Sequence, residues 1–348
     1  MPDKQIFVVQ GPTASGKTSL AIALAQHFQT EIISFDSRQF YKELAIGVAR
    51  PPLEELQQVK HHFIASHAVQ APLNAAQFAA EAQPILDRLL QEKGAVVLVG
   101  GSSLFADALL LGLDPLPHDP VVQVKWQDLY EQEGIEALQK ALQAKDPDFY
   151  QEVDVMNPLR LIRGLEINEL TGKSNLELRK GMKSDPHNLQ RFYINWPRHE
   201  LYERINWRVD QMVMEGLEQE ASLFYPQFQK LKALQTVGYQ EFFTYFDGAC
   251  DKELAIDKIK QHSRNYAKRQ LTWLRSMPER VVLPADHPQP FPDAVPEHES
   301  AVEDRHHGLG PGQQAAVDPD ADVGVAGVVV EFVHALGHAG LSLGLPRV

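Results

Sequence analysis

Eight residues near the N-terminus have the types and spacing of a loop that binds phosphate groups: Gly11, Pro12, Thr13, Ala14, Ser15, Gly16, Lys17 and Thr18. The glycines allow backbone N–H groups to turn toward an anion, and a helix that begins here adds the positive end of its dipole. Lys17 supplies a charge for the outer phosphates, and the Thr18 hydroxyl can bind Mg²⁺. The chain is therefore expected to bind a phosphorylated ligand, which the loop alone does not identify.

The segments on either side of this loop have the order that the motif requires. The apolar run at residues 6–9 predicts a strand, and the amphipathic run at residues 20–28 predicts a helix. A second predicted strand, at residues 31–35, leads directly to Asp36. A carboxylate there could bind Mg²⁺ through water or accept a proton from a nucleophile, and the plainer alternative is that it caps a turn.

A third predicted strand, at residues 95–99, ends in a sequence without an acidic residue. Two glycines and two hydroxyl residues follow it, at positions 100–103. Hydrolytic P-loop proteins usually place an acid near such a strand end to hold Mg²⁺. The sequence therefore argues against a motor ATPase or a GTPase, and it favours close approach of a ligand backbone or a planar base.

The composition is that of a globular protein with an uneven charge distribution. The 348 residues carry a net charge of −13, but residues 284–348 alone hold ten acidic residues against two arginines. The segment 258–275 holds six basic residues and no acid, so it predicts a face that meets phosphates. A single cysteine, Cys250, excludes an internal disulfide. No apolar run reaches the ~20 residues of a membrane span, and we expect a cytoplasmic protein without a membrane partner.

Alternation of strand and helix patterns predicts an α/β fold, a P-loop NTPase-like parallel sheet flanked by helices with a mainly helical inserted domain. We divide the chain into a first part of the core at residues 1–112, a helical insertion at 113–190, a second part of the core at 191–283, and an atypical tail at 284–348. In the second part, a strand is expected at 191–196. Helices are expected there at 200–225, 240–246 and 252–276.

A series of short motifs recurs in order along most of the chain, at residues 11–18, 36–41, 46–51, 61–64, 100–105, 157–166, 237–239 and 266–275. The series resembles the tRNA dimethylallyltransferase family, also called tRNA isopentenyltransferases. The resemblance covers about residues 5–280 and excludes the tail. It rests on many unrelated motifs that fall in register rather than on the phosphate loop alone.

The resemblance implies transfer of a dimethylallyl group from dimethylallyl diphosphate to N6 of the adenine immediately 3′ of the anticodon in tRNA. The phosphate loop would then hold a diphosphate leaving group together with Mg²⁺ as cofactor, bound at Thr18. Asp36 would accept the proton from N6, and Arg208 would contact the diphosphate. A monomer that binds the anticodon stem-loop is expected. The histidine pair at residues 61–62 would be structural rather than a metal site.

The same resemblance implies a set of tRNA contacts. They are Asp36, Ser37, Arg38, Gln39, Ser102, Gln123, Leu159, Arg160, Leu161, Ile162, Arg163, Gln235, Val237, Gly238, Tyr239, Gln240, Lys268, Arg269, Gln270, Trp273 and Arg275. The sequence departs from the family pattern at several of these. Gln123, Gln235 and Gln240 stand where basic residues are usual, and Leu159 stands where the family usually has Gln. Phe105 also replaces a usual Tyr.

Three other functions stay open at the level of sequence. A P-loop kinase for small molecules would share the loop and Asp36, but it would need an arginine-rich lid. An adenylate isopentenyltransferase would run the same chemistry on free nucleotide and would not need the insertion at 113–190. An RNA-binding protein without activity would leave the intact phosphate loop and Asp36 unexplained.

Overall fold

The computed structural model describes residues 4–114, 116–178, 189–275 and 281–284 of the chain. The tail predicted for residues 284–348 lies outside the described residues except for its first position. The chain divides into two compact units, one formed by Met1–Leu109 with Pro186–Val348 and the other by Leu110–Asp185. We call them the core unit and the helical unit.

The core unit is built on a parallel sheet, as the alternating pattern predicts. Its six strands lie in the order β3-β2-β4-β1-β5-β6, and every pair is parallel. The strands are β1 Gln5–Gln10, β2 Ile32–Ser34, β3 His61–His62, β4 Ala95–Gly100, β5 Leu189–Asn195 and β6 Val281–Pro284. The fold prediction is confirmed. Sequence analysis missed β3, which is too short to show a period, and β6, which adjoins the atypical tail.

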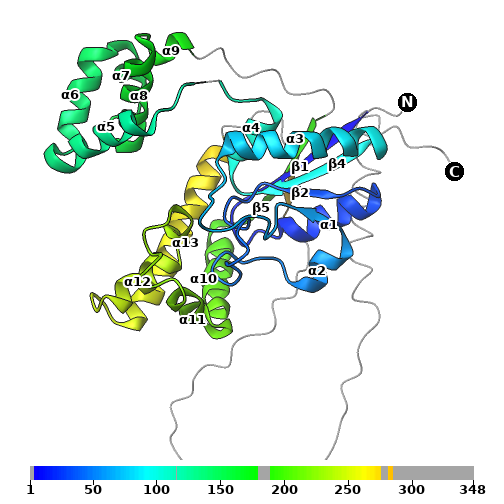
Figure 1. The fold of residues 1–348 in the computed structure, drawn as a ribbon. Coiled ribbons are helices and arrows are strands. Elements are labelled where there is room, and N and C mark those ends of the chain that lie inside the picture. The colour runs from blue at the N-terminus through cyan, green and yellow to red at the C-terminus, as the bar shows by residue number, and fades with distance from the viewer. Residues whose placement is uncertain (1–3, 115, 179–188, 276–280, 285–348) are drawn as a thin grey trace, which may run out of the picture. The chain divides into compact units, whose positions relative to one another are not determined.

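Helices cover both faces of the sheet, which explains why the central strands are continuous apolar runs (Figure 1). On one face lies α1, Lys17–His27, whose Leu24 packs with Phe7 and Val9 of β1. On the other face lies α3, Ala75–Glu92, which begins at a capping box of Asn74 and Gln77. The shorter helices α2, Leu53–Gln58, and α4, Ser103–Leu110, complete this part.

Among the described residues, four further α-helices follow β5 in the core unit: α10 Arg198–Glu215, α11 Leu217–Ser222, α12 Tyr239–Phe246 and α13 Lys252–Arg275. The single helix predicted for residues 200–225 is wrong. Gly216 adopts a left-handed φ of 107°, which ends α10 and redirects the chain into α11. The predictions for α12 and α13 agree closely with the structure. α13 packs against both α10 and α12.

The helical unit contains five helices within its described residues: α5 Pro120–Glu133, α6 Ile135–Lys145, α7 Pro147–Glu152, α8 Pro158–Thr171 and α9 Asn175–Leu178. Asp119, Asp146 and Asn157 each cap a helix whose first residue is proline, so the prolines begin helices rather than break them. Trp126 and Phe149 lie in the core of this unit. No helix in the described part of the chain has the length and apolar character of a membrane span.

Candidate active site

The phosphate loop joins β1 to α1 at the carboxyl edge of the sheet. Gly16 has a φ of 85° and Ala14 a φ of 62°, so the loop turns through two left-handed positions before α1 begins. A Cβ at Gly11 would lie 2.7 Å from Ser15 Oγ, which explains why a glycine is needed there. The loop therefore wraps tightly around the space in front of the first turn of α1, whose N–H groups have no partner inside the helix.

Lys17 is held at this loop. Its Nζ donates to the carbonyl oxygen of Pro12 at 2.7 Å. Burial lowers the pKa of Lys17 to about 8, although nearby Asp36 acts in the opposite direction and Arg208 adds to the lowering. The ammonium group is therefore poorly solvated, which strengthens its attraction for an anion that enters the pocket.

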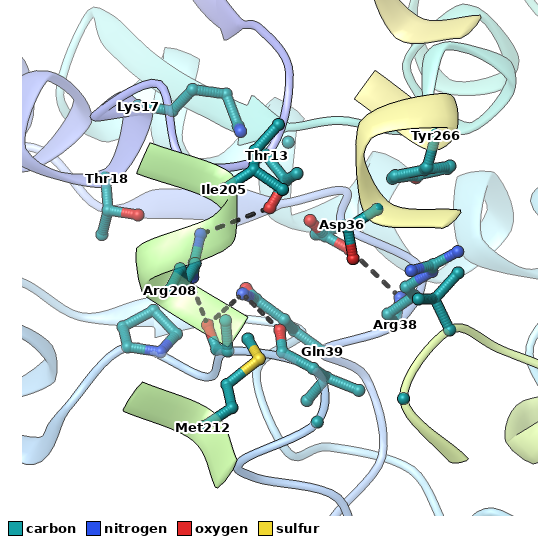
Figure 2. A pocket seen from close by; sticks show the side chains of 18 of the residues that line it. Thr13, Lys17, Thr18, Asp36, Arg38, Gln39, Ile205, Arg208, Met212 and Tyr266 are labelled. Carbon is teal, nitrogen blue, oxygen red and sulfur yellow. Dashed lines mark hydrogen bonds between the residues drawn. The ribbon is translucent and has the colours of Figure 1, made fainter. Parts of the chain in front are cut away.

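A pocket opens beside the loop and gathers residues that are far apart in the sequence (Figure 2). The phosphate loop, the end of β2, α10 and α13 all contribute to its lining. Polar side chains in the lining include Thr13, Lys17, Thr18, Asp36, Arg38, Gln39, Arg208, Tyr266 and Gln270. The structure thus unites the phosphate loop and Asp36 with Arg208, which the sequence could relate to them only by resemblance.

Asp36 projects into this pocket from the segment after β2 (Figure 2). Its Oδ1 accepts the backbone N–H of Arg38 at 3.2 Å, which fixes the carboxylate without neutralising it. The Arg38 guanidinium stacks on the ring of Tyr266, 4.1 Å from its centre. Ser37 Oγ and Ser102 Oγ are hydrogen-bonded at 2.9 Å, so the segments after β2 and β4 are joined directly beside Asp36.

Arg208 reaches the pocket from α10 and contacts the phosphate loop. It donates to Thr13 Oγ1 at 3.3 Å and to the carbonyl oxygen of Ala49 at 3.4 Å. Burial lowers the pKa of Arg208, and the carboxylates of Asp36 and Glu55 counteract this effect. An arginine keeps its charge even so. Arg208 and Lys17 therefore bring two cations to one end of the pocket.

Another part of the lining is apolar. It includes Val48, Val209, Leu217 and Ile259, which also belong to the core formed by α10 to α13. Met212 lines the pocket beside them (Figure 2). Because the packed core backs these side chains, this part has a firm apolar wall. The pocket thus combines a cationic part, a carboxylate and an apolar part.

The basic segment of α13 does not form one face. Ser263, Tyr266 and Gln270 line the pocket, whereas Lys268 and Arg275 line a separate groove beside β5. With a turn of about 100° per residue, the two sets lie on nearly opposite sides of the helix. Arg269 does not line the pocket itself, but its guanidinium lies 5.7 Å from the ring centre of Tyr266, which does. The predicted phosphate-binding face is therefore divided, and Trp273 lies half-buried on the same helix.

Several predicted tRNA contacts in the core unit are instead buried. Tyr239 has no exposed surface, and its hydroxyl donates to Glu220 at 2.5 Å. Gln270 is 9% exposed and uses both ends of its amide within the protein. Val237 and Gly238 line the pocket. The two glutamines at positions 235 and 240 are exposed and bond to each other at 2.6 Å, so their amides remain accessible.

In the helical unit, the predicted segment 159–163 divides in the same way. Leu159 and Arg160 are exposed at the start of α8. Leu161 and Ile162 are 0% and 2% exposed and belong to the core, so their packing closes them to a nucleic acid. Arg163 donates to Glu166 at 2.6 Å and to the carbonyl oxygens of residues 116 and 117. Gln123 is exposed on α5.

The oxygen donors in the pocket fit Mg²⁺ as a partial set of ligands, which a bound substrate would complete. The Thr18 hydroxyl and the Asp36 carboxylate line the same pocket and are the oxygen ligands that Mg²⁺ prefers. Across the residues that the structure describes, no three His, Cys, Asp or Glu side chains cluster as a metal site. His62 Nε2 pairs with Glu31 at 2.6 Å between β3 and β2, in keeping with a structural role for the histidine pair.

Sequence reasoning missed three residues that shape the site. Tyr266 lines the pocket four residues before Gln270, a helical spacing that could have revealed it. Glu220 accepts the backbone N–H groups of Ala45, Ile46 and Gly47, each at 2.9 Å. It thereby holds the loop that carries Gly47 and Val48 into the pocket. Trp196 contacts the phosphate loop from the end of β5, and no sequence signal identifies either Trp196 or Glu220.

Comparison with known proteins agrees with this geometry. The model of the family described as IPP transferase matches residues 39–277, a stretch that begins after the phosphate loop and Asp36 and that includes Arg208 and α13. The chain belongs to the IPP transferase family. It is 44% identical over 274 residues to tRNA dimethylallyltransferase 2 of Azobacteroides pseudotrichonymphae, covering 78% of this chain and 89% of that protein. It is 46% identical over 272 residues to tRNA dimethylallyltransferase of Christiangramia forsetii, covering 77% and 89%.

Solved structures of the family share the fold. The full-length tRNA isopentenylpyrophosphate transferase of Bacillus halodurans superposes with a TM-score of 0.61 at 34% identity, over 81% of this chain and 90% of that one. A eukaryotic dimethylallyltransferase acting on tRNA superposes with a TM-score of 0.69 at 25% identity, over 81% and 74%. The resemblance inferred from short motifs is therefore confirmed.

Proposed function

We propose that this IPP transferase family member is a tRNA dimethylallyltransferase. It transfers a dimethylallyl group from dimethylallyl diphosphate to N6 of the adenine 3′ of the anticodon. The observation that carries the proposal is one pocket whose lining unites the phosphate loop, Arg208 and Asp36 with an apolar wall. The named activities of the relatives support the same reaction.

The cationic part of the pocket suits a diphosphate leaving group. Lys17, Arg208 and the first turn of α1 all direct positive charge into it, and negative charge grows on the diphosphate as its bond to carbon breaks. Thr18 and Asp36 would hold Mg²⁺, which would supply further positive charge against the leaving group. The apolar wall formed by Val48, Val209 and their neighbours suits the five-carbon group.

Asp36 is assigned as the general base. The N6 amine attacks the first carbon of the allylic group, a C–N bond forms, and the C–O bond to diphosphate breaks. The proton leaves N6 for the Asp36 carboxylate. A positioned base contributes ~10²–10⁴-fold to such a step. The adenine must first leave its stack to reach the pocket, at a cost of a few kcal/mol.

The reaction can be tested with labelled dimethylallyl diphosphate, Mg²⁺ and unmodified tRNA. Label is expected in tRNA and absent from free AMP, while ATP should not serve as a phosphoryl donor. Asp36→Asn should lower kcat by at least ~10²-fold with little change in tRNA affinity. Transfer of label to AMP alone would indicate an adenylate isopentenyltransferase, and phosphorylation of a small molecule by ATP would indicate a kinase.

A further inference from the structure

Two side chains that do not line the pocket containing Asp36 hydrogen-bond to the backbone of the phosphate loop. Arg204 Nε, on α10, donates to the carbonyl oxygen of Ala14 at 2.9 Å. Trp196 Nε1, after β5, donates to the carbonyl oxygen of Ser15 at 3.1 Å. The Arg204 guanidinium also lies over the Trp196 ring, 4.2 Å from its centre, so the two side chains form one unit. We call this pair the loop clamp.

Because the peptide bond is planar, the loop clamp also orients backbone N–H groups on the inner side of the loop. In a trans peptide, the C=O of one residue and the N–H of the next point in opposite directions. Holding the Ala14 and Ser15 carbonyls outward therefore turns the N–H groups of Ser15 and Gly16 inward. These are the amides that a phosphate-binding loop presents to an anion.

The loop needs such support because one of its residues is strained. Ala14 has a φ of 62°, a left-handed conformation that costs a residue with a Cβ roughly 1 kcal/mol or more. Ala14 also packs with Trp196 beside the small cluster of Leu201, Ile205 and Ala267. Packing and hydrogen bonds from α10 and β5 thus hold together a turn that its own sequence does not favour.

We propose that Arg204 and Trp196 are positioning residues for the donor diphosphate. They act through the backbone of Ala14 and Ser15 and do not touch the substrate themselves. This inference rests on the proposed function, because it takes the anion in the loop to be the diphosphate of the allylic donor. It predicts that the loop clamp affects diphosphate binding selectively and leaves tRNA binding unchanged.

The test uses the full chain and inorganic diphosphate with Mg²⁺ as the probe, titrated calorimetrically. Arg204→Lys keeps the charge but loses the Nε donor, and Trp196→Phe keeps the ring but loses the N–H donor. Each variant should weaken diphosphate binding by about fivefold, the effect of one lost hydrogen bond. KM for dimethylallyl diphosphate should rise by a similar factor, while Kd for tRNA stays the same.

Arg198→Lys is the matched control. Arg198 also lies on α10 and stacks on an aromatic ring, that of Tyr202 at 5.2 Å, but its Nε donates to the Tyr202 hydroxyl rather than to the loop. This variant should bind diphosphate like the unchanged protein. The double variant of Arg204 and Trp196 should be less impaired than the product of the single effects, because both bonds hold the same turn.

Unchanged diphosphate affinity in folded Arg204→Lys and Trp196→Phe proteins would overturn the inference. A parallel loss of diphosphate and tRNA affinity would also overturn it, since that would indicate a general structural role. If the unchanged chain binds diphosphate but transfers no label to tRNA, the proposed function fails and the positioning role can still be measured. If it binds no diphosphate at all, both fail.

Discussion

Gln270 Oε1 accepts the backbone N–H of Thr13 at 3.1 Å, so that a side chain of α13 is bonded to the phosphate loop. The other end of the same amide, Nε2, donates to the carbonyl oxygen of Gly101 at 3.0 Å. Gln270 therefore sets the separation between the loop after β1 and the loop after β4. A Cβ at Gly101 would lie 2.2 Å from Gln270 Nε2, so only glycine permits this contact.

Gln270→Glu should separate the two functions of this amide. The carboxylate can still accept from Thr13, but it cannot donate to the Gly101 carbonyl and places a charge against it. We expect a loss of roughly 1–3 kcal/mol in the free energy of unfolding, together with reduced kcat. Thermal denaturation and steady-state kinetics measure the two effects. Gln83→Glu, which replaces an exposed amide on α3 that donates to Asp87, is the control; its like-charge pair should cost no more than about 0.5 kcal/mol and leave kcat unchanged.

The parts of the site that sequence reasoning identified are those encoded locally. The phosphate loop is a run of eight residues with fixed spacing between two regular elements, and Asp36 follows a strand at the edge where such loops meet. The parallel sheet follows from alternating strand and helix patterns. The fold could therefore be predicted from the sequence, apart from strands of two and four residues and the break at Gly216.

What the sequence could not predict is the direction of side chains on their elements. Lys268 and Arg269 are neighbours in the chain but lie on different sides of α13. Leu161 and Ile162 stand in a segment that resembles a tRNA contact, yet tertiary packing buries both. Trp196 and Arg204 are brought to the phosphate loop by the fold alone, across more than 180 positions of sequence.

The buried state of Lys17 predicts a pH dependence for diphosphate binding. Its pKa is about 8, so the ammonium is protonated below this pH and loses its charge above it. A bound anion favours the charged form, so affinity should be constant below about pH 8 and should fall as the pH rises further. Calorimetry of diphosphate between pH 6.5 and 9.5 measures this, with roughly a tenfold loss per pH unit at most.

Lys17→Met is the reference for that experiment. The ligand's own ionisation affects both proteins equally, so the ratio of their affinities isolates the lysine. This ratio should be large and constant up to about pH 8 and should then decline. A ratio that does not change up to pH 9.5 would mean that Lys17 stays charged throughout and that burial does not weaken its protonation in solution.

Glu31 should make the fold sensitive to acid. Burial alone would raise the pKa of Glu31, but hydrogen bonds from His62, Arg88 and Lys60 outweigh it and lower the pKa to about 2. Because the unfolded chain takes up this proton at a higher pH, the stabilisation is complete above about pH 4.5 and is lost as the pH falls toward 2. Glu31→Gln should cost about 1–2 kcal/mol at pH 7, discounted for partial exposure.

Urea denaturation of both proteins at several pH values tests this assignment. The difference in the free energy of unfolding between Glu31→Gln and the unchanged chain should shrink between pH 4.5 and pH 2. Glu92→Gln is a suitable control, because Glu92 pairs with the same Arg88 at the surface at 3.1 Å and its side chain is 54% exposed. A difference that stays constant down to pH 2 would contradict the low pKa.

The division of α13 predicts unequal contributions of its basic residues to tRNA binding. Arg269 lies beside Tyr266, which lines the pocket, whereas Lys268 and Arg275 line the groove on the other side of the helix. Arg269→Ala should therefore lower kcat/KM for tRNA by about tenfold. It should also reduce the slope of the logarithm of tRNA affinity against the logarithm of salt concentration by nearly one, the contribution of one phosphate contact. Lys268→Ala and Arg275→Ala should each have a smaller effect on both quantities.

Equilibrium binding of unmodified tRNA at several salt concentrations provides the measurement. Lys93→Ala serves as the control, because Lys93 is an exposed cation just before β4, at the edge of the sheet opposite the pocket. It should leave the salt slope unchanged. If Lys268→Ala or Arg275→Ala matches Arg269→Ala in both slope and kcat/KM, then tRNA contacts both sides of α13. Recognition of tRNA would then depend equally on both sides of the helix.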